Sequence, residues 1–194
     1  MIQDYLQAAR LRTLPLASAC VLTGGGLAAS TGIPSDRFTP LFWGCLLTVV
    51  LLQVLANFAN DLGDFENGAD TQKGQERSDR AVASGRIAAS DMRLAVYITA
   101  ALAFLVGIGT VIFAVGDAWA TLLQWVGIGV FAIGAAYAYT AGSKPYGYSG
   151  LGDLSVLIFF GVAGVAGTAS LITGEFHPEW MLPSFTIGLF SVSV

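Results

Sequence analysis

Five polar side chains recur within one otherwise apolar stretch of the sequence, and their oxygen-bearing types are those that bind cations. The stretch runs from residue 51 to residue 64. Its polar members are spaced four, three, one and three positions apart. At about 3.6 residues per turn, this spacing places them in a single stripe along a helix. The stripe comprises Gln53, Asn57, Asn60, Asp61 and Asp64.

The two aspartates of this stripe need compensation for their charge. A lone carboxylate is costly in low-dielectric surroundings, and Asp61 and Asp64 also repel each other because they lie one turn apart. A divalent cation relieves both penalties. Carboxylate oxygens suit Mg²⁺, which commonly completes its coordination shell with phosphate oxygens of a substrate. The stripe therefore predicts Mg²⁺ shared with a phosphorylated substrate.

A purely structural interpretation is that Asn60, Asp61 and Asp64 cap the end of the helix in headgroup water. Acidic residues near a helix C-terminus oppose the helix dipole, which counts against that interpretation. Ionisable residues within membrane spans are usually functional, so we favour the metal site.

Two further polar segments follow the stripe. The first contains Lys73, Arg77, Arg80 and Arg86, and guanidinium groups match phosphate oxygens bidentately. The second, residues 144–153, reads KPYGYSGLGD. Both segments lie on the same predicted side of the membrane as the stripe, which favours a single site that they enclose. The preference of basic residues for the cytoplasmic side explains the first segment equally well, and a plain turn explains the second.

The composition places these residues in a bilayer. The chain is 55% hydrophobic and 11% charged, whereas soluble domains carry about 25% charged residues. No basic patch indicates nucleic-acid binding. Cys20 and Cys45 lie in apolar runs, which argues against a disulfide or a zinc site.

Five apolar windows are long enough to cross a bilayer, and a sixth begins near Trp180. We therefore predict an all-α, multi-spanning transmembrane bundle with five complete helices and part of a sixth, and a long polar loop at 61–91. Placing the N-terminus in the cytoplasm puts eight basic residues inside and one, Arg37, outside. The complete windows are 13–30, 41–60, 92–115, 118–140 and 151–173.

Four segments resemble the UbiA-type intramembrane prenyltransferases, and more closely the branch that prenylates 1,4-dihydroxy-2-naphthoate in menaquinone biosynthesis. The resemblance covers nearly the whole chain in order. The aspartate-rich segment is fairly specific for the family, and Gly-Leu-Gly-Asp narrows the branch. The family resemblance lies in Asn60-Asp-Leu-Gly-Asp-x-x-x-Gly68-x-Asp70 and Arg80-Ala-Val-Ala-Ser-Gly-Arg-Ile. The closer match to the branch lies in the same aspartate segment together with Arg12-Thr-Leu-Pro-Leu and Lys144-Pro-Tyr-Gly-Tyr-x-Gly-Leu-Gly-Asp153.

The resemblance implies a helical bundle in the cell inner (plasma) membrane whose cavity opens sideways to lipid. A polyprenyl diphosphate would lose its diphosphate to give an allylic cation, which an aromatic acceptor such as dihydroxynaphthoate attacks, losing its carboxyl group as carbon dioxide. Mg²⁺ would be held by Asp61, Asp64 and Asp70. Lys144 would lie near the acceptor carboxylate. The catalytic residues would then be Asp61, Asp64 and Lys144. Residues expected to bind substrate are Asn57, Asn60, Lys73, Arg80 and Asp153.

The sequence departs from the family in two places. A third acidic residue is expected at position 68, where Gly68 stands instead. The family has about nine helices, with a second aspartate-rich motif after the sixth. We therefore expect the single domain 1–194 to be incomplete, and these residues alone to be inactive.

Three other functions remain open from the sequence. The first is a prenyltransferase with another acceptor, such as a quinone, chlorophyll or haem precursor. The second is a catalytically inactive membrane subunit. The third is a cation transporter or channel, which is disfavoured because polar residues do not continue across the later spans.

Overall fold

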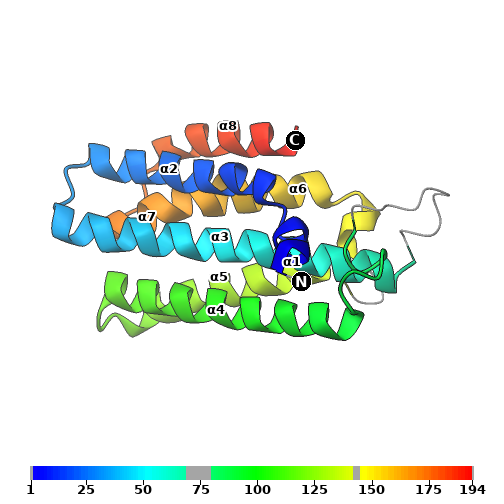
Figure 1. Cartoon of the computed structure of the whole chain (residues 1–194). Coiled ribbons are helices and arrows are strands. Elements are labelled where there is room, and N and C mark those ends of the chain that lie inside the picture. The colour runs from blue at the N-terminus through cyan, green and yellow to red at the C-terminus, as the bar shows by residue number, and fades with distance from the viewer. Residues whose placement is uncertain (1, 69–79, 142–144, 194) are drawn as a thin grey trace.

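In a computed structural model, which describes residues 2–68, 80–141 and 145–193, the chain forms a bundle of antiparallel helices (Figure 1). All regular structure in these residues is helical, as predicted. The helices are α1 (Ile2–Ala8), α2 (Leu14–Ser30), α3 (Ser35–Glu66), α4 (Ala89–Val115), α5 (Trp119–Ala138), α6 (Gly152–Val156), α7 (Thr168–Thr173) and α8 (Met181–Val192), with short helices η1 (Leu11–Thr13), η2 (Tyr146–Ser149) and η4 (Pro178–Trp180) and a π-helical stretch η3 (Leu157–Gly167).

Within the described residues, five helical segments are long and apolar enough to cross a membrane, which confirms the predicted number of complete spans. Three of them are α3, α4 and α5. The other two run through several elements, one from α1 to α2 and one from α6 through η3 to α7. Residues from Trp180 onward form the shorter α8.

The predicted start of the polar loop at residue 61 is wrong. Helix α3 continues to Glu66, so Asp61 and Asp64 lie on the helix itself. The helix persists through this polar stretch because neighbouring segments bond its side chains and keep them out of water. Asp61 and Asp64 are 2% and 6% exposed.

Helix α3 lies at the centre of the bundle and packs against α2, α4 and α5. Near its C-terminal end, apolar residues of the turn after Arg80 pack into a cluster with α1, α3 and α4. Ala81, Val82 and Ile87 are buried there against Phe58. This packing brings residues 80–87 back over the end of α3.

Small residues let two helices approach closely, as the abundance of glycine predicts. A Cβ atom on Gly161 in η3 would lie 2.6 Å from the carbonyl oxygen of Ser184 in α8 and 3.1 Å from Cα of Gly188. A side chain does not fit at that distance, so glycine fixes the spacing between these two helices.

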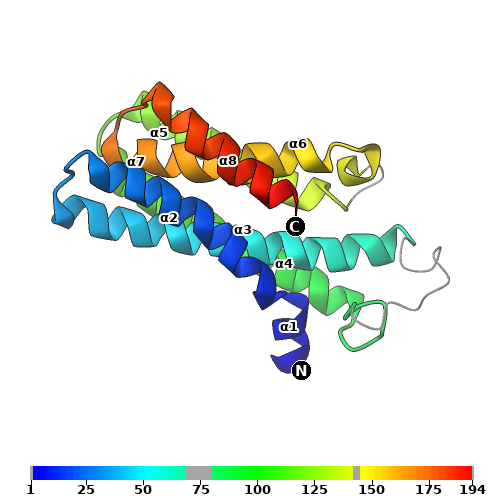
Figure 2. The same ribbon diagram turned by 90° about the horizontal axis from the view of Figure 1, so that it is seen from above.

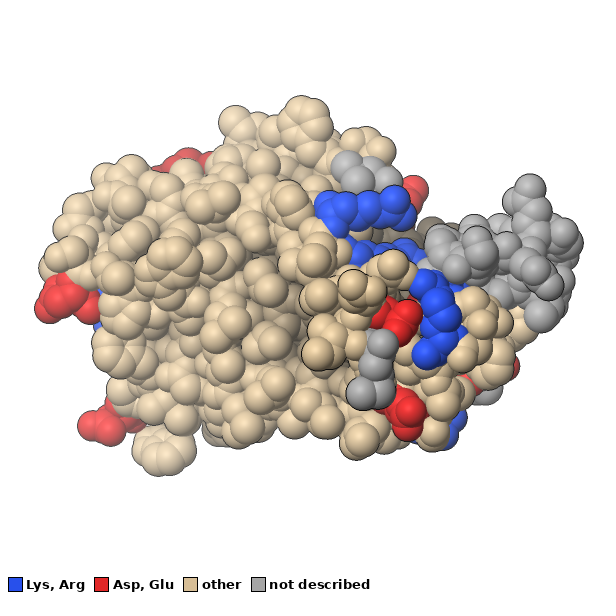
Figure 3. All heavy atoms as spheres, in the orientation of Figure 1, with Lys and Arg blue, Asp and Glu red and all other residues tan. Residues whose placement is uncertain are grey.

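On the face that Figure 3 shows, charged side chains gather toward the two ends of the bundle and an uncharged region lies between them. The helices also contain hydroxyl groups. Many of these donate a hydrogen bond to the carbonyl oxygen four residues earlier on their own helix, which satisfies the donor without water. These include Thr23, Thr48, Thr99, Thr110, Thr173, Ser184, Thr186 and Ser191, with oxygen–oxygen distances of 2.7–2.9 Å.

Candidate active site

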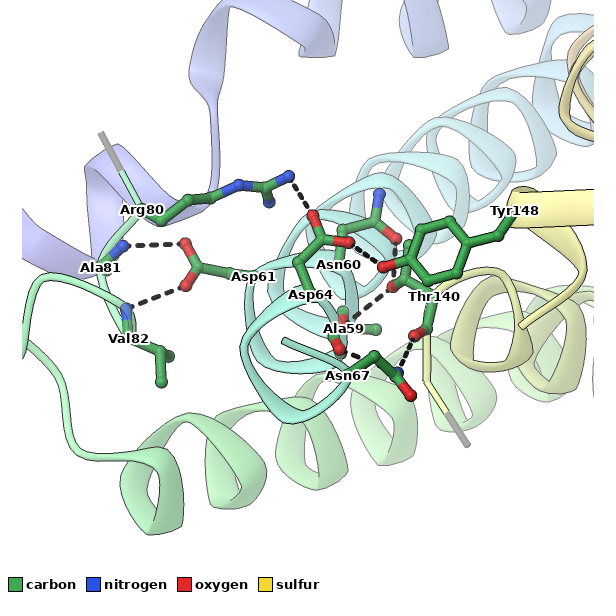
Figure 4. Close-up of polar contacts among 11 residues, drawn as sticks. Ala59, Asn60, Asp61, Asp64, Asn67, Arg80, Ala81, Val82, Thr140 and Tyr148 are labelled. Atoms are coloured by element: carbon green, nitrogen blue, oxygen red, sulfur yellow. Dashed lines mark hydrogen bonds and ion pairs between the residues drawn. The ribbon is translucent and has the colours of Figure 1, made fainter. Parts of the chain in front are cut away.

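Asp64 joins three segments at one end of the bundle. Arg80 Nη2 donates to Asp64 Oδ2 from the turn that precedes α4, and the Tyr148 hydroxyl donates to Asp64 Oδ1 from η2 (Figure 4). The side chains of Arg80 and Asp64 are 7% and 9% exposed, so their charges oppose each other in a poorly solvated position. A buried charge requires such a partner, which explains why Arg80 folds inward.

Asp61 points away from Asp64, although the two residues lie one turn apart (Figure 4). Its Oδ2 accepts the backbone N–H of Ala81 at 3.0 Å, and its Oδ1 accepts that of Val82 at 2.9 Å. A carboxylate bonded to two backbone amides is a strong anchor, since hydrogen bonds to charged groups are roughly twice as strong as neutral ones. Asp61 therefore fixes the turn that carries Arg80.

A polar seam joins this end of α3 to the end of α5. The Thr140 hydroxyl lies 2.9 Å from Asn60 Oδ1 and 3.2 Å from the carbonyl oxygen of Ala59. Asn67 Nδ2 donates to the carbonyl oxygen of Thr140 at 2.9 Å. A Cβ atom on Gly63 would lie 2.5 Å from the same oxygen. The two helices are thus held at backbone contact beside Asp64.

Asn57 lies nearer the middle of α3 and holds the N-terminal part of the chain. Its Nδ2 donates to the carbonyl oxygen of Ala9 at 2.8 Å and to Thr13 Oγ1 at 3.0 Å. Gln53 also donates to Thr13 Oγ1, at 3.1 Å. Arg10 has a left-handed backbone with φ of 49°, and α1 leaves α2 there at an angle (Figure 2). Asn57 therefore stabilises this bend.

An apolar cavity of about 470 Å³ lies among α2, α3, α4, α5 and η3. Its walls are mainly aliphatic and aromatic side chains. Polar side chains that line it include Asn57 and Asn60 from the stripe and, beyond α5, Tyr139 and Tyr146. Asn60 directly precedes Asp61 and lies one turn before Asp64, so the cavity reaches the acidic end of α3.

The segment that carries Tyr148 is anchored to α5. The Tyr146 hydroxyl donates to the carbonyl oxygen of Ala135 at 3.0 Å, and the Gly147 N–H donates to that of Tyr139 at 3.0 Å. The rings of Tyr139 and Tyr146 meet edge to face at 5.4 Å. Burial raises the pKa of the Tyr139 phenol above its ordinary value, and Tyr146 and nearby carboxylates raise it further, so this phenol stays neutral near pH 7.

The structure therefore brings together four of the residues predicted from sequence. Asn60, Asp61, Asp64 and Arg80 meet at the end of α3, while Asn57 lies one turn deeper. Asp153 is exposed in the first turn of α6. The other three predicted site residues, Asp70, Lys73 and Lys144, lie outside the described residues.

Sequence reasoning did not single out Tyr148 or Thr140. Tyr148 lies inside the segment 144–153, but a tyrosine there has no charge to mark it as a site residue. Thr140 is the last residue of the predicted apolar window 118–140 and carries no signal in the sequence.

The oxygen donors at Asp64 suit a hard divalent cation. Its Oδ2 accepts a hydrogen bond from Arg80 and its Oδ1 one from Tyr148, and each oxygen has a second lone pair. Asp61 fits less well, because both of its oxygens serve the backbone of the turn. In the part of the chain that the structure describes, no group of three or more His, Cys, Asp or Glu could hold a metal ion. Of the two aspartates in the stripe, Asp64 is therefore the one whose oxygens are less occupied by the backbone.

Comparison with known proteins identifies relatives along the whole chain. It is 41% identical over 198 residues to 1,4-dihydroxy-2-naphthoate octaprenyltransferase of Haemophilus influenzae, covering 100% of this chain and 62% of the relative. The Escherichia coli protein of the same name is 39% identical over 99% of this chain and 61% of its own length. The Mycobacterium tuberculosis protein is 34% identical over 98% and 61%.

The chain thus spans about three fifths of the length of these relatives. Comparison with solved structures finds no match. The UbiA prenyltransferase family matches residues 17–194, which include the whole of the aspartate stripe and both polar segments. This chain belongs to the UbiA prenyltransferase family.

Proposed function

We propose that the protein transfers a polyprenyl group from a polyprenyl diphosphate to 1,4-dihydroxy-2-naphthoate, with loss of the acceptor's carboxyl group as carbon dioxide. The observation that carries this proposal is the Asp64–Arg80–Tyr148 network at the polar end of an apolar cavity inside a membrane bundle. Three relatives of this chain are named for octaprenyl transfer to that acceptor.

The cavity and the network suit the two halves of a polyprenyl diphosphate. Aliphatic and aromatic walls accommodate an isoprenoid chain, which gains free energy by leaving water. Arg80 supplies a guanidinium fork for phosphate oxygens. In the chain described here its charge is balanced by Asp64, so an incoming diphosphate exchanges one anionic partner of Arg80 for another.

Members of this family generally use a divalent metal, and we propose Mg²⁺ as that ion, held by Asp64 together with Asp61 and Asp70 as the sequence predicts. When bound, the ion supplies charge compensation to the departing diphosphate. Asp64 contributes oxygen ligands, and Asp61 keeps the turn with Arg80 in place. Tyr139 and Tyr146 present ring faces and edges at the same end of the cavity.

In the proposed reaction, the carbon–oxygen bond to the diphosphate breaks and its electron pair leaves with the diphosphate. The allylic cation forms a carbon–carbon bond with the acceptor ring at the carbon that bears the carboxyl group, and that group departs as carbon dioxide. Lys144 is proposed to lie near the acceptor carboxylate, and Asn57, Asn60, Lys73 and Asp153 to bind substrate.

We further propose that the protein resides in the cell inner (plasma) membrane with the acidic end of α3 in the cytoplasm. Support comes from the basic residues, which are enriched on the cytoplasmic side of membrane proteins. Of those that the structure describes, five belong to the segments around the acidic end of α3: Arg10, Arg12, Arg80, Arg86 and Arg93. Arg37 lies in the first turn of α3, at the other end.

The test is binding of radiolabelled polyprenyl diphosphate to residues 1–194 in membranes. Product formation after dihydroxynaphthoate is added is measured on a chain extended to the length of the relatives, because residues 1–194 alone are expected to be inactive. Binding should require Mg²⁺ and disappear with a chelator. Asp64→Asn should weaken it about a hundredfold or more, because a neutral amide replaces a charged ligand. Asp36→Asn, an exposed residue in the first turn of α3, is the matched control. Equal binding with and without metal would overturn the metal-diphosphate site, and product that keeps its carboxyl group would overturn the proposed reaction.

A further inference from the structure

Tyr148 combines an exposed ring with a hydroxyl bonded to a buried carboxylate. The residue is 51% exposed, whereas Asp64, which accepts its hydroxyl hydrogen, is 6% exposed. An exposed tyrosine gains little free energy from burial of its ring. Its bond to Asp64 gives this side chain a direct effect on the site.

The fold around Tyr148 does not depend on that bond. Its segment is already fixed to α5 by the Tyr146 hydroxyl and the Gly147 N–H. Helix α3 is held to α5 independently, through Thr140 and Asn67. Loss of the Tyr148 hydroxyl would thus remove a contact between two walls that other bonds keep in place.

The orientation of the Asp64 carboxylate does depend on it. Arg80 donates to one oxygen and Tyr148 to the other, so together they oppose rotation of the carboxylate plane (Figure 4). Arg80 is also the group that suits a diphosphate, and its bond to Asp64 is then open to exchange. The Tyr148 hydroxyl remains to hold Asp64 when Arg80 turns to the phosphate oxygens.

We propose that Tyr148 is a positioning residue: its hydroxyl orients Asp64 for a divalent metal ion shared with a diphosphate group. This inference rests on the function proposed above. Carboxylates that ligate metal ions are themselves commonly hydrogen-bonded, and removal of such a partner typically lowers metal affinity about 10- to 100-fold.

The experiment measures the affinity of the purified protein in lipid nanodiscs for inorganic diphosphate with Mg²⁺, by calorimetric titration. Tyr148→Phe, which keeps the ring and removes the hydroxyl, should weaken binding about tenfold or more. The midpoint of thermal unfolding without ligand should stay at the wild-type value. Tyr97→Phe is the matched control, since Tyr97 lies on α4 and is 58% exposed.

Asp64→Asn, measured in parallel, separates the two proposals. If Asp64→Asn binds the metal diphosphate as well as wild type does, the proposed site is wrong. If Asp64→Asn abolishes binding while Tyr148→Phe binds normally, the site stands and the positioning role of Tyr148 is wrong. A Tyr148→Phe protein that unfolds several degrees earlier without ligand would show that the hydroxyl serves the fold instead.

Discussion

Two arginines at opposite ends of the bundle have partners of different kinds. Arg80 pairs with the carboxylate of Asp64 and is 6% exposed. Arg37, in the first turn of α3, donates to backbone carbonyl oxygens instead, from Nε to Ile172 at 3.1 Å and from Nη2 to Ala114 at 3.0 Å. Those carbonyls belong to the last turns of α7 and α4, where helices leave acceptors unsatisfied.

This difference is the basis for assigning Arg80, and not Arg37, to the proposed diphosphate site. The carbonyl groups around Arg37 carry only partial negative charge, and they are fixed in the backbone of two helices, so Arg37 acts as a cap. Arg80 faces a full carboxylate, and another anion can take its place. The contrast also explains why, among the described basic residues, Arg37 lies at the opposite end of the bundle: it closes two helix ends.

The largest expected effect concerns the side of the membrane that each end faces. Cysteine introduced at Ser35, which is exposed at the start of α3, should react with an impermeant maleimide added to intact cells. Cysteine at Ser90, exposed in the first turn of α4, should not react until the membrane is opened. Cys20 and Cys45 are buried and should contribute little background. Ready labelling at position 90 from outside would reverse the proposed orientation.

The next effect compares the two arginines directly. Arg80→Gln should weaken Mg²⁺-dependent binding of inorganic diphosphate by about 10- to 100-fold, since it removes a charge-assisted hydrogen bond to the anion. Arg37→Gln should leave this affinity unchanged and lower the free energy of unfolding by about 1–3 kcal/mol, since helix carbonyls lose their donor.

A conservative variant sharpens this comparison. Arg80→Lys keeps the charge and loses the bidentate geometry, so it should retain more of the diphosphate affinity than Arg80→Gln does. Both variants are measured by calorimetric titration, with thermal unfolding recorded alongside. Comparable losses of diphosphate affinity in Arg37→Gln and Arg80→Gln would contradict the assignment of one arginine to the fold and the other to the ligand.

The smallest effect separates the two aspartates of the stripe. Asp61→Asn should speed hydrogen exchange at the backbone amides of Ala81 and Val82, because one oxygen that accepts them becomes an NH₂ group. Exchange is measured by mass spectrometry. Diphosphate affinity should fall less than in Asp64→Asn. Unchanged exchange combined with an equal loss of affinity would show that Asp61 does not anchor the turn and serves the proposed metal site as fully as Asp64 does.

The helices were predictable from sequence, because an apolar run of bilayer length leaves few alternatives to a membrane-spanning helix. The spacing of the stripe also predicted that the two acidic residues lie on one helix. The different partners of Asp61 and Asp64 were not predictable. The stripe pattern places Asp61 and Asp64 on one helix face, but it carries no information about which segment folds against each of them.

Tyr148 illustrates the same limit. It lies 84 positions after Asp64 in the chain, and its bond depends on how η2 is anchored to α5. Neither residue type nor spacing encodes that anchoring. The prediction that a loop begins at residue 61 is wrong for the same reason. Polar residues after an apolar run are typical of a loop, but contacts from other segments stabilise these residues as helix.

The hydroxyl groups that bond to their own helix have a consequence for how lipid tails meet the protein. A threonine such as Thr186, whose hydroxyl lies 2.9 Å from the carbonyl oxygen of Leu182, has its hydrogen directed along its own backbone, leaving the methyl group as its other terminal group. The exposed part of such a threonine is therefore similar to valine in shape and in its low polarity. Hydropathy scales that score each residue separately therefore underestimate how apolar the outer surface of these helices is.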